Sequence, residues 1–181
     1  NIFIISGPSG VGKGTVINKL KELKPSINIA ISATTRLPRK DEINKETYYF
    51  LSETEFQQKI NTDSFLESCE VHGNWYGTLR EEVDRYITNE KDILLEIDTN
   101  GAEKVKRKCP SAITIFLKPP SFEELENRLR QRNTEEDAQL KKRLKRAGDE
   151  ILKENDYDYV VINTDIVTTA KEIYNIMFKH S

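Results

Sequence analysis

The chain has 181 residues, of which 36% are apolar and 32% charged, and its 28 basic and 30 acidic side chains leave a formal net charge of −2. This length and composition predict one compact, soluble domain, and no apolar run approaches the roughly 18 residues that a membrane-spanning helix needs. The balanced charge excludes a general nucleic-acid binder, because nonspecific affinity for a polyanion depends on clustered lysine and arginine. We therefore expect any bound anion to be small and locally held.

Short β-branched runs alternate with amphipathic patterns along the chain, which is typical of α/β proteins built around a parallel sheet. Strands are expected at residues 2–5, 27–31, 93–97, 113–117 and 159–162. Apolar residues at helical spacing predict helices within residues 16–23, 125–129, 140–151 and 170–177. The sequence thus predicts a parallel sheet with helices between its strands.

Two segments interrupt this alternation. Residues 32–78 contain many turn-forming residues, a short helix that Ser52 begins with Glu55 three positions later, and a further strand, so they are predicted to form an inserted α+β subdomain. Residues 121–149 contain two charged helices and are predicted to form a helix-loop-helix arm. The core of this single domain is then made of residues 1–31, 79–120 and 150–181.

Residues 7–15 have the sequence GPSGVGKGT and connect the first predicted strand to the first predicted helix. This pattern indicates a phosphate-binding loop, in which backbone N–H groups and the helix N-terminus surround phosphate oxygens while Lys13 reaches the β- and γ-phosphates. The strict pattern has Ser or Thr directly after the lysine, whereas this chain has Gly14 followed by Thr15. We therefore expect magnesium to be held by Thr15 or through water.

Arg36 and Arg39 are three residues apart in a segment that Pro38 stiffens. Guanidinium forks suit phosphate, and Tyr48 and Tyr76 can add hydroxyl donors to the same anion. Without other support, such an arginine pair is more often a solvated surface feature.

Seven motifs in order make the chain similar to the guanylate kinase family over essentially its whole length. They are GPSGVGKGT at 7–15, SATTRLPR at 32–39, FLE at 65–67, GNWYGT at 73–78, LEID at 95–98, FLKPPS at 116–121 and RNTEE at 132–136. The resemblance implies transfer of the γ-phosphoryl group of ATP to GMP or dGMP, giving ADP and GDP or dGDP, with Mg²⁺ as cofactor. It also implies a P-loop NTPase-type core, a GMP-binding subdomain at 32–78 and a mobile lid at 121–149.

By position, the resemblance assigns two binding sites and a catalytic set. The ATP-binding residues are Gly7, Ser9, Gly10, Val11, Gly12, Lys13, Gly14, Thr15, Arg132 and Asn163. The GMP-binding residues are Ser32, Arg36, Arg39, Tyr48, Glu67, Tyr76, Thr78 and Asp98. The catalytic set is Lys13, Arg39, Arg132 and Arg143, and the candidates for holding magnesium, directly or through water, are Thr15 and Asp98.

The chemistry of guanine agrees with the assignment of Glu67. Guanine presents N1–H and an amino group side by side, which one carboxylate accepts together, whereas adenine has an acceptor at N1. Ser32 or Thr78 can donate to guanine O6. Glu96 and Asp98 follow an apolar strand at the carboxyl edge of the sheet, beside the nucleotide site. We favour Asp98 over Glu96 for a direct role; alternatively, either residue only caps the next helix.

The arm carries many basic residues, most of which we expect to be solvated. Leu140, Leu144 and Ala147 define the helix face toward the core, and Arg143 lies about 70° from the centre of that face at 100° per residue. Arg143 can therefore lean over a neighbouring cleft.

Two other functions must be weighed against that of a guanylate kinase. A guanylate-kinase-like scaffold module binds a phosphorylated peptide through the former GMP site, but such modules typically lack the phosphate loop, which this chain has together with Arg132 and Arg143. An adenylate kinase shares the GKGT ending but does not account for Glu67 with GNWYGT. The kinase acting on GMP is therefore the favoured function.

Cys69 and Cys109 are too few for a disulfide framework and have no metal-ligand spacing, so both are expected to be reduced. The chain opens on an apolar strand without a basic leader, which favours a cytoplasmic protein. Small-molecule substrates are the expected partners, with no nucleic acid and no membrane, and the oligomeric state is left open.

Overall fold

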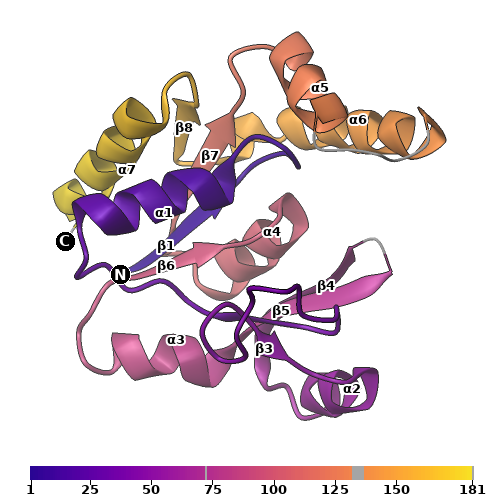
Figure 1. Cartoon of the computed structure of the whole chain (residues 1–181). Helices are drawn as coiled ribbons and strands as arrows, with labels where there is room; N and C mark the ends of the chain where they lie inside the picture. Colours follow the sequence, from indigo (N-terminus) through magenta and orange to yellow (C-terminus); the bar gives the residue numbers. More distant parts are fainter. Residues whose placement is uncertain (72, 132–136, 181) are drawn as a thin grey trace.

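The computed structural model describes residues 1–71, 73–131 and 137–180. Its main sheet has four parallel strands in the order β6–β1–β7–β8 (Figure 1). The strands are β1 (Ile2–Ser6), β6 (Ile93–Glu96), β7 (Ile113–Lys118) and β8 (Tyr159–Ile162). This confirms the predicted α/β core and four of the five predicted core strands.

Helices cover both faces of the main sheet (Figure 1). On one face, α1 (Lys13–Leu23) and α7 (Ile166–His180) pack against Phe3 and Ile5 of β1. On the other face, α3 (Arg80–Ile87) and α4 (Thr99–Lys108) pack against Ile4. Successive side chains of a strand point to opposite faces, so the first four residues of β1 are all apolar because both faces of the sheet are covered.

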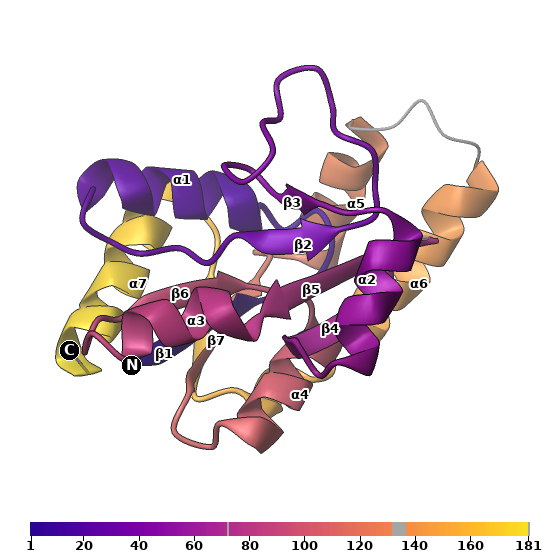
Figure 2. The same cartoon turned by 90° about the horizontal axis from the view of Figure 1, so that it is seen from below.

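The second sheet is separate from the first and has the strand order β3–β2–β5–β4 (Figure 2). Its strands are β2 (Ser32–Thr34), β3 (Tyr49–Phe50), β4 (Phe65–Val71) and β5 (Asn74–Leu79). Helix α2 (Glu53–Asn61) packs on this sheet through Phe56, whose ring stacks on Phe65 at 4.4 Å between centroids. The predicted N-cap is confirmed, since Ser52 and Glu55 form a capping box.

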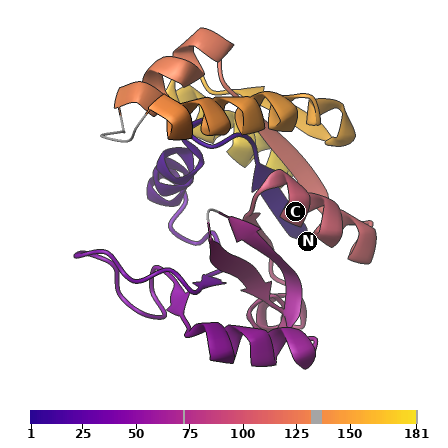
Figure 3. The ribbon, with the colours of Figure 1, turned by 90° about the vertical axis from the view of Figure 1, so that its right-hand side faces the viewer.

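The arm contains α5 (Phe122–Gln131) and α6 (Asp137–Ile151) and lies on the opposite side of the molecule from α2 (Figure 3). Leu125 and Leu129 of α5 pack against Leu140 and Ala147 of α6. Ser121 caps α5 by accepting the N–H of Glu124 at 3.1 Å, as the spacing predicts. The corresponding spacing of Thr134 with Asp137 lies outside the described residues. A 3₁₀ turn, η1 (Glu154–Asp156), leads into β8.

The predicted strand at 27–31 is wrong. Only Ile29 pairs with the sheet, through one parallel bridge to Leu94. The backbone of Leu94 bonds to Asn28 and Ala30 on either side of that bridge, and the chain then leaves the main sheet for β2. A single bridge does not extend into a ladder, although the apolar composition of the segment resembles that of a strand.

Helix α3 has no counterpart among the predicted helices, although Val83, Tyr86 and Ile87 have helical spacing. These three residues make up a single helical turn among charged neighbours, which is too short a pattern to stand out in the sequence. None of the helices that the structure describes is long and apolar enough to cross a membrane.

Candidate active site

The loop between β1 and α1 owes its shape to glycine. Gly7 and Gly12 have φ of 148° and 98°, a region that residues with a side chain rarely adopt. A Cβ on Gly7 would lie 2.3 Å from the carbonyl oxygen of Leu117. Among the described residues, none caps α1 through its side chain, so the first N–H groups of this helix are available to an anion.

Lys13 is held over this loop. Its Nζ donates to the carbonyl oxygens of Gly7 at 2.7 Å and Pro8 at 3.3 Å. Burial lowers the pKa of Lys13, and nearby carboxylates, Glu96 foremost, oppose that shift. A phosphate entering the loop would thus meet an ammonium group that is already in place.

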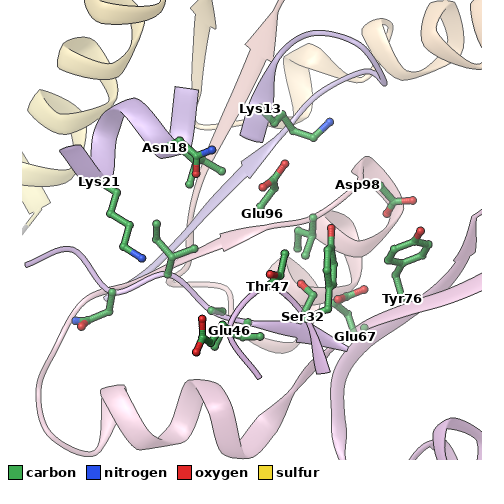
Figure 4. Close-up of a pocket in the computed structure, with 18 of the residues that line it drawn as sticks. Lys13, Asn18, Lys21, Ser32, Glu46, Thr47, Glu67, Tyr76, Glu96 and Asp98 are labelled. Carbon is green, nitrogen blue, oxygen red and sulfur yellow. The ribbon is translucent and has the colours of Figure 1, made fainter. Parts of the chain in front are cut away.

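Two cavities lie on either side of the loop. The first has a volume of about 590 Å³, and its lining includes Lys13, Ser32, Tyr48, Glu67, Tyr76, Glu96 and Asp98 (Figure 4). The second has a volume of about 570 Å³, and its lining includes Gly10, Gly12, Thr15, Arg128 and Asn163. Both volumes are within the range of pockets that bind small molecules. The loop therefore separates two sites of nucleotide size.

Glu67 lies on β4 at the base of the first cavity and is only 4% exposed. Thr78 of the neighbouring strand β5 donates its hydroxyl to Glu67 Oε1 at 2.8 Å. Burial raises the pKa of Glu67 to about 7, although the hydrogen bond from Thr78 opposes the shift. Because Thr78 gives its one hydroxyl proton to Glu67, that proton is not available to a ligand in this arrangement.

Arg36 and Arg39 lie on the loop after β2, and both are tied to Glu42. The Arg36 guanidinium makes two hydrogen bonds to the Glu42 carboxylate, at 2.8 and 2.9 Å, and Arg39 donates its backbone N–H to Glu42 at 2.7 Å. Arg36 also lies over the ring of Tyr48, with 5.5 Å between the guanidinium carbon and the ring centroid. The Tyr48 and Tyr76 rings are 6.3 Å apart, so Arg36 and the two phenols expected to hold a phosphate lie together. The Arg39 side chain is exposed, and the described lining of the first cavity includes the two tyrosines but neither arginine.

The second cavity brings α5 and the segment after β8 to the outer side of the loop. Arg128 donates to the Val11 carbonyl oxygen at 3.3 Å, and Asn163 donates its side-chain N–H to the same oxygen at 2.8 Å. Arg143 of α6 donates to the Ser9 hydroxyl at 3.2 Å. The arm and the C-terminal segment thus contact the phosphate loop directly.

This arrangement was compared with known proteins. The family description "Guanylate kinase" matches residues 1–180. The chain belongs to the guanylate kinase family. A guanylate kinase of Prochlorococcus marinus is 44% identical over 176 residues, covering 97% of this chain and 96% of that protein. One from Clostridioides difficile is 41% identical over 176 residues, covering 97% and 86%.

The solved structure of guanylate kinase from Anaplasma phagocytophilum superposes with a TM-score of 0.82 at 37% identity, covering 99% of this chain and 85% of that one. As a guanylate kinase, the chain is an ATP:GMP phosphotransferase, a nucleoside monophosphate kinase that transfers the γ-phosphoryl group of ATP to GMP. The scaffold-module alternative is not favoured, because the curated relatives are enzymes and the phosphate loop is present.

Within this guanylate kinase, Asp98 caps the next helix, which is one of the two alternatives considered from the sequence, and its direct role stays a prediction. It is the N-cap of α4, since Oδ1 accepts the N–H of Gly101 at 2.7 Å, and it also lines the first cavity. Its Oδ2 accepts a hydrogen bond from Arg146 of α6 at 3.0 Å. Capping the helix fixes the carboxylate at the edge of the cavity.

Arg146 and Glu42 are site residues that the motifs do not reveal. Arg146 connects Asp98 to Glu150, whose Oε1 it contacts at 3.0 Å, and Glu150 Oε2 accepts the N–H of Ser9 at 3.4 Å. A repeat of apolar residues in α6 shows where the core is but not which basic residue meets a carboxylate from another element. Arg132, which the resemblance places in the catalytic set, lies outside the described residues.

Proposed function

We propose that this guanylate kinase binds the base of GMP through Glu67 in the first cavity. A carboxylate there accepts guanine N1–H and the amino group together, and Ser32 at the same cavity donates to O6. The observation that carries the proposal is the burial of Glu67 beneath an open cavity of nucleotide size. None of these contacts involves the ribose 2′-hydroxyl, so dGMP should be accepted as well.

The phosphate of GMP would replace Glu42 as the partner of Arg36. An incoming phosphate offers the same fork of two oxygens as the Glu42 carboxylate, with more charge. Arg39, Tyr48 and Tyr76 complete the site from the same loop and from β5. Residues 32–78 then act as the GMP-binding subdomain.

ATP would occupy the second cavity, with its phosphates on the loop from Gly7 to Thr15 and its base near Asn163 and Arg128. The acceptor phosphate is already ionised near neutral pH, so no general base is required. Catalysis then consists of aligning donor and acceptor and of neutralising charge on the moving phosphoryl group with Lys13, Arg39, Arg132 and Arg143. Residues 121–149 serve as the lid that brings the last two arginines to ATP.

Magnesium fits this site, because carboxylate oxygens of Glu96 and Asp98 line the first cavity beside Lys13. When bound with ATP, the ion neutralises charge on the transferring phosphates. Among the described residues, no cluster of three or more acidic, Cys or His residues forms a cage. We expect the ion to be held mainly by phosphates and water, with one or two carboxylates, as Mg²⁺ usually is beside a nucleotide.

We place the reaction in the cytoplasm, with nucleotides as the only partners. Cys69 and Cys109 are both free thiols, which suits a reducing compartment.

The test is a coupled assay of ADP release with GMP, dGMP, AMP, CMP and UMP as acceptors, with and without Mg²⁺. GMP should be preferred by a wide margin, dGMP should be used, and chelation should abolish turnover. Equal turnover of AMP would contradict the assignment of Glu67 as the guanine acceptor.

A further inference from the structure

The residue directly after Lys13 is not the Ser or Thr that the strict phosphate-loop pattern has at that position. That pattern puts a Ser or Thr hydroxyl directly after the lysine, on the metal. Here Gly14 has no side chain, and Thr15, the next hydroxyl, is exposed and lines the second cavity, with Gly10 and Gly12. The first cavity, with Lys13, therefore contains no hydroxyl from this loop among the residues described as lining it.

Glu96 faces the space beside Gly14. A Cβ at position 14 would lie 3.8 Å from Glu96 Oε1 and 3.9 Å from Oε2, so both carboxylate oxygens face the residue after the lysine. Figure 4 shows Glu96 below Lys13 in the first cavity. The end of β6 thus brings a carboxylate within van der Waals distance of the place where the Cβ of a Ser or Thr would be.

This carboxylate is not engaged elsewhere. Burial raises the pKa of Glu96, and the charge of Lys13 opposes this shift. Among the described residues, none donates a hydrogen bond to the Glu96 carboxylate. Lys13 itself donates to backbone carbonyl oxygens of the loop. A buried carboxylate that accepts no hydrogen bond is unfavourable, and binding a cation compensates its negative charge.

Asp98 is a weaker candidate because its oxygens are already used. Oδ1 accepts the N–H of Gly101 at the start of α4, and Oδ2 accepts Arg146 at 3.0 Å. Binding magnesium there would require breaking the ion pair to Arg146, and the guanidinium would remain beside the metal.

We propose that Glu96 is the residue that anchors the magnesium ion of Mg·ATP, taking the place of the hydroxyl that Gly14 lacks. The inference rests on the proposed use of magnesium by this site. It predicts that the two positions are interchangeable, so that a hydroxyl at 14 compensates for the loss of the carboxylate at 96. The Cβ of that hydroxyl-bearing side chain would make only ordinary van der Waals contacts with Glu96.

The experiment measures the affinity of the folded protein for a non-hydrolysable ATP analogue by calorimetry, with Mg²⁺ and with chelator. The quantity compared is the ratio of the two dissociation constants, which is independent of turnover. We expect Glu96→Gln to lower this magnesium enhancement roughly tenfold, as loss of a group that orients a bound metal commonly does. Gly14→Ser combined with Glu96→Gln should restore it.

Glu150→Gln is the matched control, since Glu150 also acts on Lys13 but is engaged by Arg146 and the Ser9 N–H. It should leave the magnesium enhancement unchanged. If Glu96→Gln does not fold by circular dichroism, Glu96→Asp, which keeps the charge and shortens its reach, should show the same loss.

The inference is overturned if the magnesium enhancement survives in Glu96→Gln, or in Glu96→Asp where that variant replaces it. It is also overturned if the enhancement falls equally in Glu150→Gln. A failure of the proposed function looks different, because the wild-type protein would then bind the analogue equally with and without Mg²⁺. Wild-type protein that shows the enhancement, beside a Glu96→Gln variant that keeps it, refutes the role of Glu96 alone.

Discussion

The phosphate loop and the first cavity meet at Lys13, yet they are built in different ways. The loop is one continuous segment whose shape depends on positive φ at its glycines and on the start of α1. The cavity takes Ser32 from β2, Glu67 from β4 and Asp98 from the end of β6. A donor site made of backbone binds any triphosphate, whereas an acceptor site made of side chains from several strands can select one base.

This difference predicts two classes of variant. Changes on the donor side should lower kcat, because the groups there stabilise charge on the moving phosphoryl group. Changes on the acceptor side should mainly raise the KM for GMP, because the groups there hold the ground-state ligand.

The largest effect is expected for Lys13→Met. Removing a buried cation that faces the transferring phosphoryl group should lower kcat by about 10²- to 10³-fold, as loss of one preorganised electrostatic group typically does. Steady-state kinetics with GMP would measure this. Lys19→Met is the control, because Lys19 lies on the same helix but is outside the lining of both cavities, and it should behave like the wild type. A normal kcat for Lys13→Met would contradict the proposal that the groups on the donor side stabilise the moving phosphoryl group.

The next largest effects should distinguish Arg143, which is expected to act on kcat, from Arg36, which is expected to act on the KM for GMP. Arg143→Ala should lower kcat by about 10², because its guanidinium lies at the donor loop beside Ser9. Arg36→Ala should instead raise the KM for GMP, since it removes a charge-assisted pair worth about 1.5 to 3 kcal/mol. Lys142→Ala, exposed on α6, serves as control. Unchanged kcat in Arg143→Ala, or a fall in kcat alone in Arg36→Ala, would reverse the assignments.

Glu67→Gln should reduce kcat/KM for GMP by about 1 to 3 kcal/mol, because an amide cannot accept both guanine donors. Competition between GMP and AMP measures the resulting loss of selectivity. Glu70→Gln, on the same strand but exposed, is the matched control. If both variants keep the preference for GMP, guanine is selected elsewhere.

The same variant should be more stable than the wild type at high pH. Burial raises the pKa of Glu67 from its ordinary value of 4.5 to about 7, so the folded state binds a proton more tightly than the unfolded state. The free energy of unfolding therefore falls as pH rises through this window, by about 3 kcal/mol in total at 1.36 kcal/mol per unit. Thermal unfolding should show a higher Tm for Glu67→Gln than for wild type at pH 8 and little difference near pH 5. A Tm difference that is the same at both pH values would exclude a titrating Glu67.

The smallest effect is expected for Arg146→Ala, which cuts the connection between α6, Asp98 and Glu150. The Arg146 side chain is 32% exposed, so each ion pair should contribute no more than about 1 kcal/mol. Chemical denaturation should show this loss in Arg146→Ala. Lys145→Ala, which changes an exposed residue of α6, should not show it. Identical stability of the two variants would mean that solvent already screens the pairs.

The sequence by itself determined the features that depend on neighbours along the chain. The phosphate loop follows from glycine spacing between an apolar strand and a helix, and the N-caps at Ser52 and Ser121 follow from a hydroxyl and a carboxylate three residues apart. The assignment of Glu67 needed the family resemblance, since an isolated Glu resembles any surface acid.

Only the tertiary structure decided which distant groups meet. Segment 27–31 has the composition of a strand but forms a single bridge, because the chain leaves the sheet after Ala30. The pairing of Arg146 with Asp98 and the approach of Glu96 to Gly14 join residues 48 and 82 positions apart. No local pattern encodes such contacts, since they depend on how helices and strands pack, and that packing places the carboxylates beside the phosphate loop.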